Sequence, residues 1–224
     1  MVNKFDTPEE NDNRAYSYEG HENEVRKEYN RIVDLVKPNS KIVDLGCGNG
    51  VLLERLILQK HVHAFGMEIS ENAVSICRQK NLSVLQGRID EVLPFNDTEF
   101  DYAICNVTIQ MVMYPERLLR EMKRVAKRQI ISFPNFAFWK NRIDLLLQGR
   151  MPHHVLFGYP WYATGHIHQL SIHDFKNLVN TVGGLKIVEQ QYADDLSPLK
   201  NMIADSFPNL FHLIPIYLIE KEST

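Results

Sequence analysis

Cysteine, net charge and long apolar runs are all scarce in this sequence. Its three cysteines, Cys47, Cys77 and Cys105, stand far apart with no Cys-x-x-Cys pair, which indicates a reducing cytoplasm, with Cys77 and Cys105 as small core residues. A net charge of −3 gives no electrostatic footprint for nucleic acid or an anionic membrane. The polar, acidic residues 1–13 are not a signal peptide, and the most apolar stretch, residues 210–219, is far shorter than the ~20 residues of a membrane span. We therefore expect a cytoplasmic protein whose partners are neither nucleic acid nor membrane.

Two common phosphate-binding patterns are also missing. No Gly-Lys-Ser/Thr follows a glycine turn, which excludes a phosphate P-loop, and the glycines are spaced G-x-G-x-G instead of the dinucleotide G-x-G-x-x-G. The chain does contain a short apolar run, an acid and three glycines, Ile42-Val43-Asp44-Leu45-Gly46-Cys47-Gly48-Asn49-Gly50, followed by a helical pattern over residues 51–59. A strand, a glycine turn and a helix place free backbone N–H groups and the positive end of a helix beside the carboxyl end of the strand. This arrangement predicts a nucleotide-type site.

A second acid supports the same prediction. Residues 65–69 are predicted to form the next strand, and Glu68 lies eighteen positions after Gly50. In dinucleotide folds an acid about twenty residues on grips the ribose diol, because its two oxygens accept from both hydroxyl groups at once. The alternative is an unliganded glycine turn with a solvated Glu68. The joint placement of acid, glycines and second acid favours the ligand site.

Strand and helix patterns alternate along the remaining chain. Further strands are predicted over residues 82–85, 100–105, 129–133, 185–192 and 215–220, and helices over residues 21–36, 70–80, 115–128, 136–148 and 171–183. Such alternation requires right-handed helical crossovers between parallel strands, so helices cover both faces of the sheet. Ligands of these sheets bind at the carboxyl ends of strands, where Asp44, Glu68, Asp90 and Asn106 all fall. We predict one α/β domain over residues 1–224, with an N-terminal arm over residues 1–20.

The stretch 134–170 is too long for an ordinary connection and is interpreted as an inserted helix followed by a lid rich in aromatic residues and histidine. Four of its histidines, His153, His154, His166 and His168, could suggest a metal site, but their spacing matches no zinc-finger pattern and no cysteine lies nearby. His168 is the best candidate for a catalytic base, with a hydrogen-bonded structural histidine as the alternative. Trp161 and Tyr162 fit a lid core better than a cage for a cation. The basic face of the 115–128 helix is interleaved with acids, which favours a solvated face over a partner-binding one.

The string Val43-Asp44-Leu45-Gly46-Cys47-Gly48-Asn49-Gly50, with Glu68 after it, resembles motif I and the acidic motif of the class I S-adenosylmethionine (SAM)-dependent methyltransferases. The resemblance implies a Rossmann-like, mostly parallel seven-stranded sheet with helices on both faces and an antiparallel last strand. It also implies that Gly46, Gly48 and the neighbouring backbone hold the methionine part of SAM, that Asp44 faces its ammonium group and that Glu68 faces its ribose. The full set of expected cofactor contacts is Asp44, Gly46, Cys47, Gly48, Gly50, Glu68, Ile69, Ile89, Asp90 and Asn106.

A closer resemblance covers roughly residues 40–190. Its motifs are Pro134-Asn135-Phe136, Trp139, Leu145-Leu146-Leu147, Gly149-Arg150-Met151-Pro152, Trp161-Tyr162 and Ile167-His168, together with Gly87-x-Ile89-Asp90-Glu91 and Thr108-x-Gln110. These strings look like the MetW family, SAM-methyltransferase-fold proteins associated with methionine biosynthesis. The family resemblance implies action beside a homoserine O-acyltransferase.

One residue departs from the family pattern. After the third strand, such chains carry Gly-Asp, with the acid at the adenine amino group, whereas this chain has Gly87-Arg88. A guanidinium has no acceptor, so Arg88 cannot make that bond. Either Asp90 takes the role from further along the chain, or the backbone of Ile89 reads adenine alone.

Two hypotheses about function follow. The first is a methyltransferase that acts on a small metabolite and releases S-adenosylhomocysteine; residues 106–109, Asn-Val-Thr-Ile, disfavour amino-methylation of a nucleobase, which uses an Asn-Pro-Pro-Tyr/Phe motif. The second is a non-catalytic SAM-binding subunit that regulates the homoserine O-acyltransferase.

Overall fold

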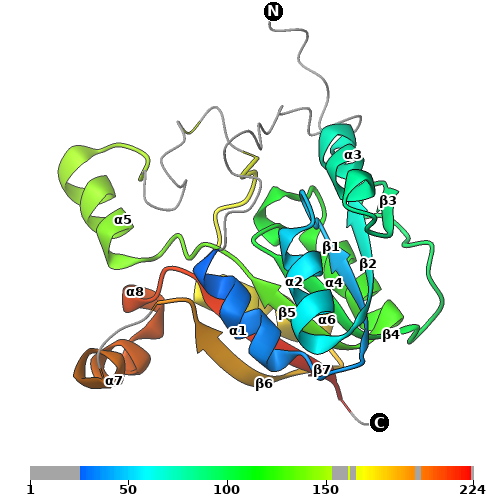
Figure 1. Ribbon diagram of the computed structural model, residues 1–224. Helices are drawn as coiled ribbons and strands as arrows, with labels where there is room; N and C mark the ends of the chain where they lie inside the picture. The colour runs from blue at the N-terminus through cyan, green and yellow to red at the C-terminus, as the bar shows by residue number, and fades with distance from the viewer. Residues whose placement is uncertain (1–25, 153–160, 162–164, 195–197, 223–224) are drawn as a thin grey trace, which may run out of the picture.

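The computed structural model describes residues 26–152, 161, 165–194 and 198–222, with the backbone alone at residues 198–201. A seven-stranded sheet forms the centre of the molecule (Figure 1). Its order is β3-β2-β1-β4-β5-β7-β6, with β1 Lys41–Leu45, β2 His63–Glu68, β3 Val84–Gln86, β4 Phe100–Asn106, β5 Ala126–Ser132, β6 Leu185–Tyr192 and β7 Pro215–Lys221. Strands β1 to β5 pair in parallel, and β7 runs antiparallel to both β5 and β6. The predicted mostly parallel sheet with an antiparallel last strand is confirmed.

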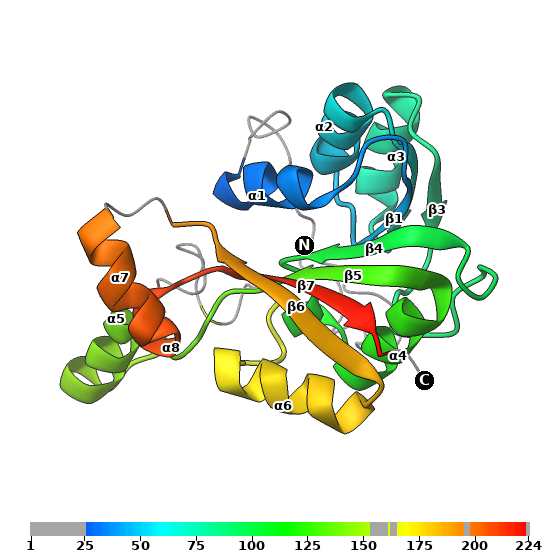
Figure 2. The same ribbon diagram turned by 90° about the horizontal axis from the view of Figure 1, so that it is seen from below.

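Helices cover both faces of this sheet. Figure 2 shows α1, α2 and α3 on one side of the strands and α4 and α6 on the other. Their bounds are α1 Lys27–Leu35, α2 Val51–Lys60, α3 Glu71–Gln79, α4 Pro115–Val125 and α6 Ile172–Val182. The N-termini of α3 and α6 are capped as the sequence predicts: Ser70 accepts from the N–H of Ala73, and Ser171 forms a reciprocal capping box with Asp174.

Alternation along the strands divides the core into two halves. Ile42, Ile104 and Ile130 pack against α1 and α2, while their neighbours Val43, Cys105 and Ile131 pack against α4 and α6. Because successive side chains of a strand point to opposite faces, an apolar strand buried on both faces supplies both halves at once. Cys77 and Cys105 are fully buried, as predicted for small core residues.

Several predicted boundaries are wrong, among them those of the strands expected over residues 65–69 and 129–133, which are β2 His63–Glu68 and β5 Ala126–Ser132. The helix expected over residues 115–128 ends at Val125, and β5 begins at Ala126, because Ala126 pairs with Phe100 of β4. Ala126 is small, apolar and buried, and such a residue suits the inner face of a helix or a strand, so the apolar pattern could not locate the end of the helix. The third strand begins at Val84, not residue 82, because Leu82 closes the end of α3 by donating its N–H to the Cys77 carbonyl.

The inserted segment contains the predicted helix in a shorter form. It consists of α5 Trp139–Ile143, continued by the π-helical turn η2 Asp144–Gln148, and it ends at Gly149 in the left-handed conformation. Two further helices, α7 Pro198–Ser206 and α8 Pro208–Phe211, lead into β7. The N-terminal arm, the expected helical residues 21–25, and His153, His154 and Tyr162 of the lid lie outside the described residues. No helix of the described chain is long and apolar enough to cross a membrane.

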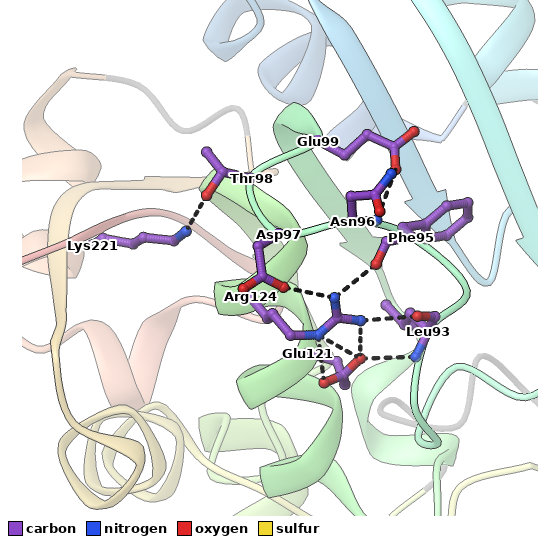
Figure 3. Close-up of polar contacts among 9 residues, drawn as sticks. All are labelled: Leu93, Phe95, Asn96, Asp97, Thr98, Glu99, Glu121, Arg124 and Lys221. Atoms are coloured by element: carbon purple, nitrogen blue, oxygen red, sulfur yellow. Dashed lines mark hydrogen bonds and ion pairs between the residues drawn. The ribbon is translucent and has the colours of Figure 1, made fainter.

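Arg124, near the end of α4, ties the connection between β3 and β4 to the body (Figure 3). Its guanidinium donates to the carbonyls of Leu93 and Phe95 at 2.9 and 2.7 Å, and it pairs with Glu121 and Asp97 at 2.6 and 3.0 Å. These interactions raise the pKa of Arg124 above its usual value, with the Glu121 hydrogen bond as the largest cause. This side chain of the basic helix face is therefore a structural anchor instead of a solvated charge.

Candidate functional site

The glycine turn between β1 and α2 is held against the end of β2. The N–H groups of Gly46 and Cys47 both donate to the Met67 carbonyl, at 2.8 and 3.3 Å. Gly46 has φ +83°, and a Cβ placed on it would lie 2.5 Å from Cγ2 of Thr108. Only glycine combines this backbone conformation with such a close approach. The turn therefore lies directly against the loop after β4. This is expected, because β1 and β4 are parallel neighbours and the loops that follow them lie at the same edge of the sheet.

Glu68 is the acidic residue at the end of β2, and its carboxylate is fixed by three backbone N–H groups. Its Oε1 accepts from Ile69 at 2.8 Å and Ser70 at 2.9 Å, and its Oε2 accepts from Gly48 at 2.9 Å. The side chain is buried. Glu68 thus joins the glycine turn to the start of α3, and its Oε2, which accepts one N–H group, has more free acceptor capacity than Oε1, which accepts two.

Asp44 is a fully buried carboxyl group, and its Oδ1 has no hydrogen-bond partner in the described structure. Burial, together with repulsion from the Glu68 carboxylate, raises the pKa of Asp44 to about 7. Buried polar atoms in native proteins nearly always have a partner, so an orphaned carboxylate oxygen signals a missing donor. A ligand ammonium group is the kind of donor that would supply both the hydrogen bond and the positive charge.

Cys47 and Gly50 have structural roles that the sequence did not separate from ligand contact. The Cys77 thiol donates to the Gly48 carbonyl at 3.2 Å, and its hydrogen bond with Cys47, followed by burial, raises the pKa of Cys47 well above its usual value. Cys47 is thus an un-ionised thiol. A Cβ on Gly50 would meet Cδ1 of Leu82 at 2.4 Å, so this glycine is required by packing below the turn.

The residues expected near adenine are engaged with one another. Arg88 donates to Oδ2 of Asp90 at 3.0 Å, and the same oxygen accepts from the N–H groups of Met113 and Tyr114 at 2.9 and 3.2 Å. With three donors on one oxygen, Asp90 anchors the loop that leads into α4. Its other oxygen, or the buried Ile89 backbone segment, remains the predicted adenine contact.

Asn106 lies at the end of β4, in register with Ser132 of β5. Ser132 donates its hydroxyl to Oδ1 of Asn106 at 2.5 Å and accepts the N–H of Val107, which has φ +51°. This positive φ is uncommon for a β-branched residue and turns the chain sharply across the end of the sheet. Ser132 and Thr108 shape the site but were not among the predicted contacts; the position of Ser132 at the carboxyl end of β5, and of Thr108 just after β4, is the signal that could have found them.

The segment 165–170 crosses the loop after β4 and brings two histidines there. Gln110 accepts both the Ile167 and the His168 N–H at 3.0 Å, and its side-chain amide lies 3.4 Å from Nε2 of His166. Nε2 of His168 lies 3.4 Å from the Met113 carbonyl. A carbonyl only accepts, so Nε2 of His168 is the donor in this contact. Within the described residues no three His, Cys, Asp or Glu side chains converge to hold a metal ion.

Comparison with known proteins gives consistent matches. The family model "Methionine biosynthesis protein MetW" matches residues 26–219. The bifunctional methionine biosynthesis protein MetXA/MetW of Rhodopirellula baltica is 30% identical over 190 residues, which are 80% of this chain and 30% of that protein. A demethylmenaquinone methyltransferase of Bacillus cereus is 36% identical over 126 residues, 51% of each chain. The chain therefore spans about a third and about half of the length of these relatives.

Solved structures agree on the fold. The S-adenosylmethionine-dependent methyltransferase from Mesorhizobium loti superimposes with a TM-score of 0.62 at 17% identity, over 87% of this chain and 98% of that chain. The putative methyltransferase in complex with the Haloferax volcanii Trm112 activator superimposes equally well, at 0.62, over 89% of this chain. The Rossmann-like class I methyltransferase fold is thereby established.

Proposed function

The chain belongs to the MetW family, and from that premise we propose that it binds SAM at the carboxyl edge of β1 and β2 and transfers a methyl group to a small metabolite linked to methionine biosynthesis. The observation that carries the proposal is the orphaned, buried carboxyl of Asp44 beside the fixed carboxylate of Glu68. Two acids and a glycine turn at one sheet edge fit a ligand that carries an ammonium group and a ribose diol.

The residues present fit the parts of SAM one by one. Asp44 would face the ammonium group, and the backbone at Gly46, Cys47 and Gly48 would lie along the amino-acid tail. Glu68 would accept from the ribose hydroxyl groups, because Ile69 and Ser70 hold its carboxylate in place. Gly50, Ile69, Ile89, Asp90 and Asn106 complete the proposed set, with Ile89 and Asp90 toward adenine.

Bound SAM supplies a methyl group on a sulfonium, which is already electrophilic, so the protein has to orient the acceptor and exclude water. Nδ1 of His168 would take the proton of an oxygen or nitrogen acceptor during methyl transfer. Its orientation by the Met113 carbonyl supports this role. We assign the product as S-adenosylhomocysteine and the location as the cytoplasm, which the free thiols Cys47, Cys77 and Cys105 support.

The second candidate function is a regulatory partner of a homoserine O-acyltransferase. The observation that favours it is the Rhodopirellula baltica relative, in which MetXA and MetW are parts of one protein. The replacement of the adenine-binding acid by Arg88 is compatible with a protein that binds SAM without efficient turnover. Both candidates use the same SAM site.

Incubation of the purified protein with methyl-labelled SAM and a metabolite extract separates the two candidates. Transfer of label to a small molecule supports the methyltransferase. SAM binding without transfer, together with co-purification of the acyltransferase, supports the regulatory partner. The absence of SAM binding in calorimetric titration would overturn both.

A further inference from the structure

A group of apolar side chains on the inserted helix is exposed to solvent. Leu146 is 83% exposed and Leu147 is 74% exposed. The exposed apolar surface consists of Trp139, Ile143, Leu145, Leu146, Leu147 and Met151, and no residue of η2 is buried. Figure 1 shows α5 at one end of the molecule, away from β3 and α3.

The inserted helix buries only one residue, Asn141, and leaves its apolar side chains exposed. Trp139 and Ile143 lie one turn apart on α5, and Leu145, Leu146 and Leu147 follow them in the π-helical turn η2. Surface helices of globular proteins turn their apolar side chains toward the core. Here these side chains are exposed, which marks a surface that is covered by something else.

A polar anchor fixes the helix in this orientation. Asn141 is fully buried, and its amide donates to the carbonyls of Asn135 and Phe136 at 3.4 and 3.0 Å. Asn135, also fully buried, donates to the carbonyls of Asn209 and His212. The helix is therefore held to the body through Asn141, while Leu146 and Leu147 stay exposed.

The charged groups around the apolar surface are mainly basic. Lys140, Arg142 and Arg150 are exposed, and Asp144 is the only acid between residues 139 and 152. In a two-fold contact between copies of this chain, the same patch would meet itself and bring these cations together. Like charges disfavour such a contact, whereas a partner with an acidic rim would gain from it.

We propose that this surface docks on the homoserine O-acyltransferase, through an apolar patch rimmed by carboxylates on that enzyme. The inference rests on the proposed partnership and adds to it the face that makes the contact. In the Rhodopirellula baltica relative the MetXA and MetW parts share one chain, so a contact between them forms at high effective concentration. Leu146 and Leu147 are the expected anchors, because they are the two most exposed members of the surface.

The test uses the full chain and the homoserine O-acyltransferase of the same organism. Wild type, Leu146→Asp/Leu147→Asp and the control Leu58→Asp are titrated against the acyltransferase by calorimetry; Leu58, on α2, is 76% exposed and lies outside the surface. We expect the double variant to lose at least about 30-fold in affinity and the control to keep wild-type affinity. Wild type and both variants should bind SAM equally, which shows that they are folded. Arg150→Glu should weaken binding most at low ionic strength.

The outcomes distinguish the surface from the partnership. If wild type binds the acyltransferase and the double variant binds as tightly, the partnership stands and this surface is wrong. If wild type does not bind the acyltransferase, both are overturned. Wild-type dimers that the double variant dissociates, without acyltransferase binding, would assign the surface to a second copy of the chain and would also overturn the proposal.

Discussion

The ionisation of one carboxyl group, Asp44, connects ligand binding to stability. With a pKa of about 7, the group is half protonated near neutral pH when no ligand is present. Only the ionised form attracts an ammonium group, so binding has to remove this proton. Ionised Asp44 is therefore unfavourable in the free protein, where no cation faces it, and is stabilised in the complex by the ammonium group of the ligand.

Affinity for SAM is therefore expected to depend on pH through Asp44. Below pH 7, affinity should fall by about tenfold for each unit of pH, because the ionised fraction falls by that factor. Asp44→Asn should bind SAM weakly, and its affinity should not change with pH in this way. Calorimetric titrations between pH 5.5 and 8.5 measure both profiles, and a flat wild-type profile would contradict the assignment of Asp44 to the ammonium group.

The same group should lower the stability of the free protein as pH rises. The unfolded chain ionises Asp44 near pH 4 and the folded chain near pH 7, so the free energy of unfolding falls across this interval, by on the order of 4 kcal/mol if Asp44 acts alone. Asp44→Asn should abolish this contribution and should be more stable than wild type at pH 8. Urea unfolding at pH 4, 6 and 8, without SAM, provides the comparison.

Glu68 is predicted to carry the ribose contact. Glu68→Ala should weaken SAM binding by roughly 2–3 kcal/mol, or about 30–100-fold, because charge-assisted hydrogen bonds are lost. The matched control is Glu71→Ala, an exposed acid in the first turn of α3, which should leave the affinity unchanged. Titration calorimetry that gives equal affinities for Glu68→Ala and wild type would refute the ribose assignment.

The turn between β1 and α2 is the element on which the site depends, and its geometry is set by contact with the loop after β4. Gly46→Ala combines a left-handed backbone with a Cβ 2.5 Å from Thr108, whereas Gly149→Ala has a similar φ and open space. We expect Gly46→Ala to cost roughly 1–3 kcal/mol more than Gly149→Ala. When it is added to Gly46→Ala, Thr108→Ala should recover part of the lost stability, because it shortens the side chain that the new Cβ meets. Urea unfolding of Gly46→Ala, Gly149→Ala, Thr108→Ala and the double variant Gly46→Ala/Thr108→Ala tests this, and equal costs at the two glycines would show that Thr108 moves aside at little cost.

The segment 165–170 is a separate element that contacts the loop after β4 through Gln110. Its position predicts that His168→Ala keeps SAM affinity and loses methyl transfer, because the histidine is assigned to the acceptor side. Equilibrium binding and label transfer are measured on the same preparation. Loss of SAM binding in His168→Ala would instead make this segment structural.

Across the whole molecule, the carboxyl edge of the sheet carries the candidate ligand site, and the amino edge carries a network that stabilises the fold. The carboxyl edge carries Asp44, Glu68 and Asn106, while the Arg124 network of Figure 3 lies at the amino end of β4, next to Thr98, whose N–H donates to the Arg124 carbonyl. A seven-residue strand separates the two by roughly 20 Å. Substitutions at the amino edge should therefore change stability without changing the site.

Arg124→Ala is expected to destabilise the protein by roughly 2–4 kcal/mol, since it leaves the Leu93 and Phe95 carbonyls and the Glu121 carboxylate without their partner. Arg124→Lys should recover only part of this, because an ammonium cannot reproduce the planar fork. Asp97→Ala, which removes a largely exposed member of the network, should cost less than about 1 kcal/mol. Urea unfolding measures the three costs, and SAM titration should give wild-type affinity for all; a large loss of affinity in Arg124→Ala would contradict the separation of the two edges.

Much of this architecture is encoded locally. The apolar runs at residues 42–45 and 100–105, the caps at Ser70 and Ser171, and the glycines after β1 predict most strands and helices, because period, capping and backbone freedom are properties of neighbouring residues. The same patterns place Asp44, Glu68 and Asn106 at one edge, since parallel strands align their carboxyl ends. The end of α4 was predicted wrongly because Ala126 suits either a helix or a strand. Its pairing with Phe100, which lies 26 residues earlier, places it in β5.

The state of the site depends on contacts between distant residues. The sequence indicates that Asp44 is an acid after a strand, but its orphaned oxygen and its pKa near 7 arise from the packing around it and from Glu68. Likewise Leu145-Leu146-Leu147 could belong to a core helix by pattern alone, whereas in the structure Asn141 is the residue of this helix that is buried and hydrogen-bonded to the body, and the three leucines are exposed. Solvation and long-range contact energies depend on the whole surroundings of a group, which no short stretch of sequence contains.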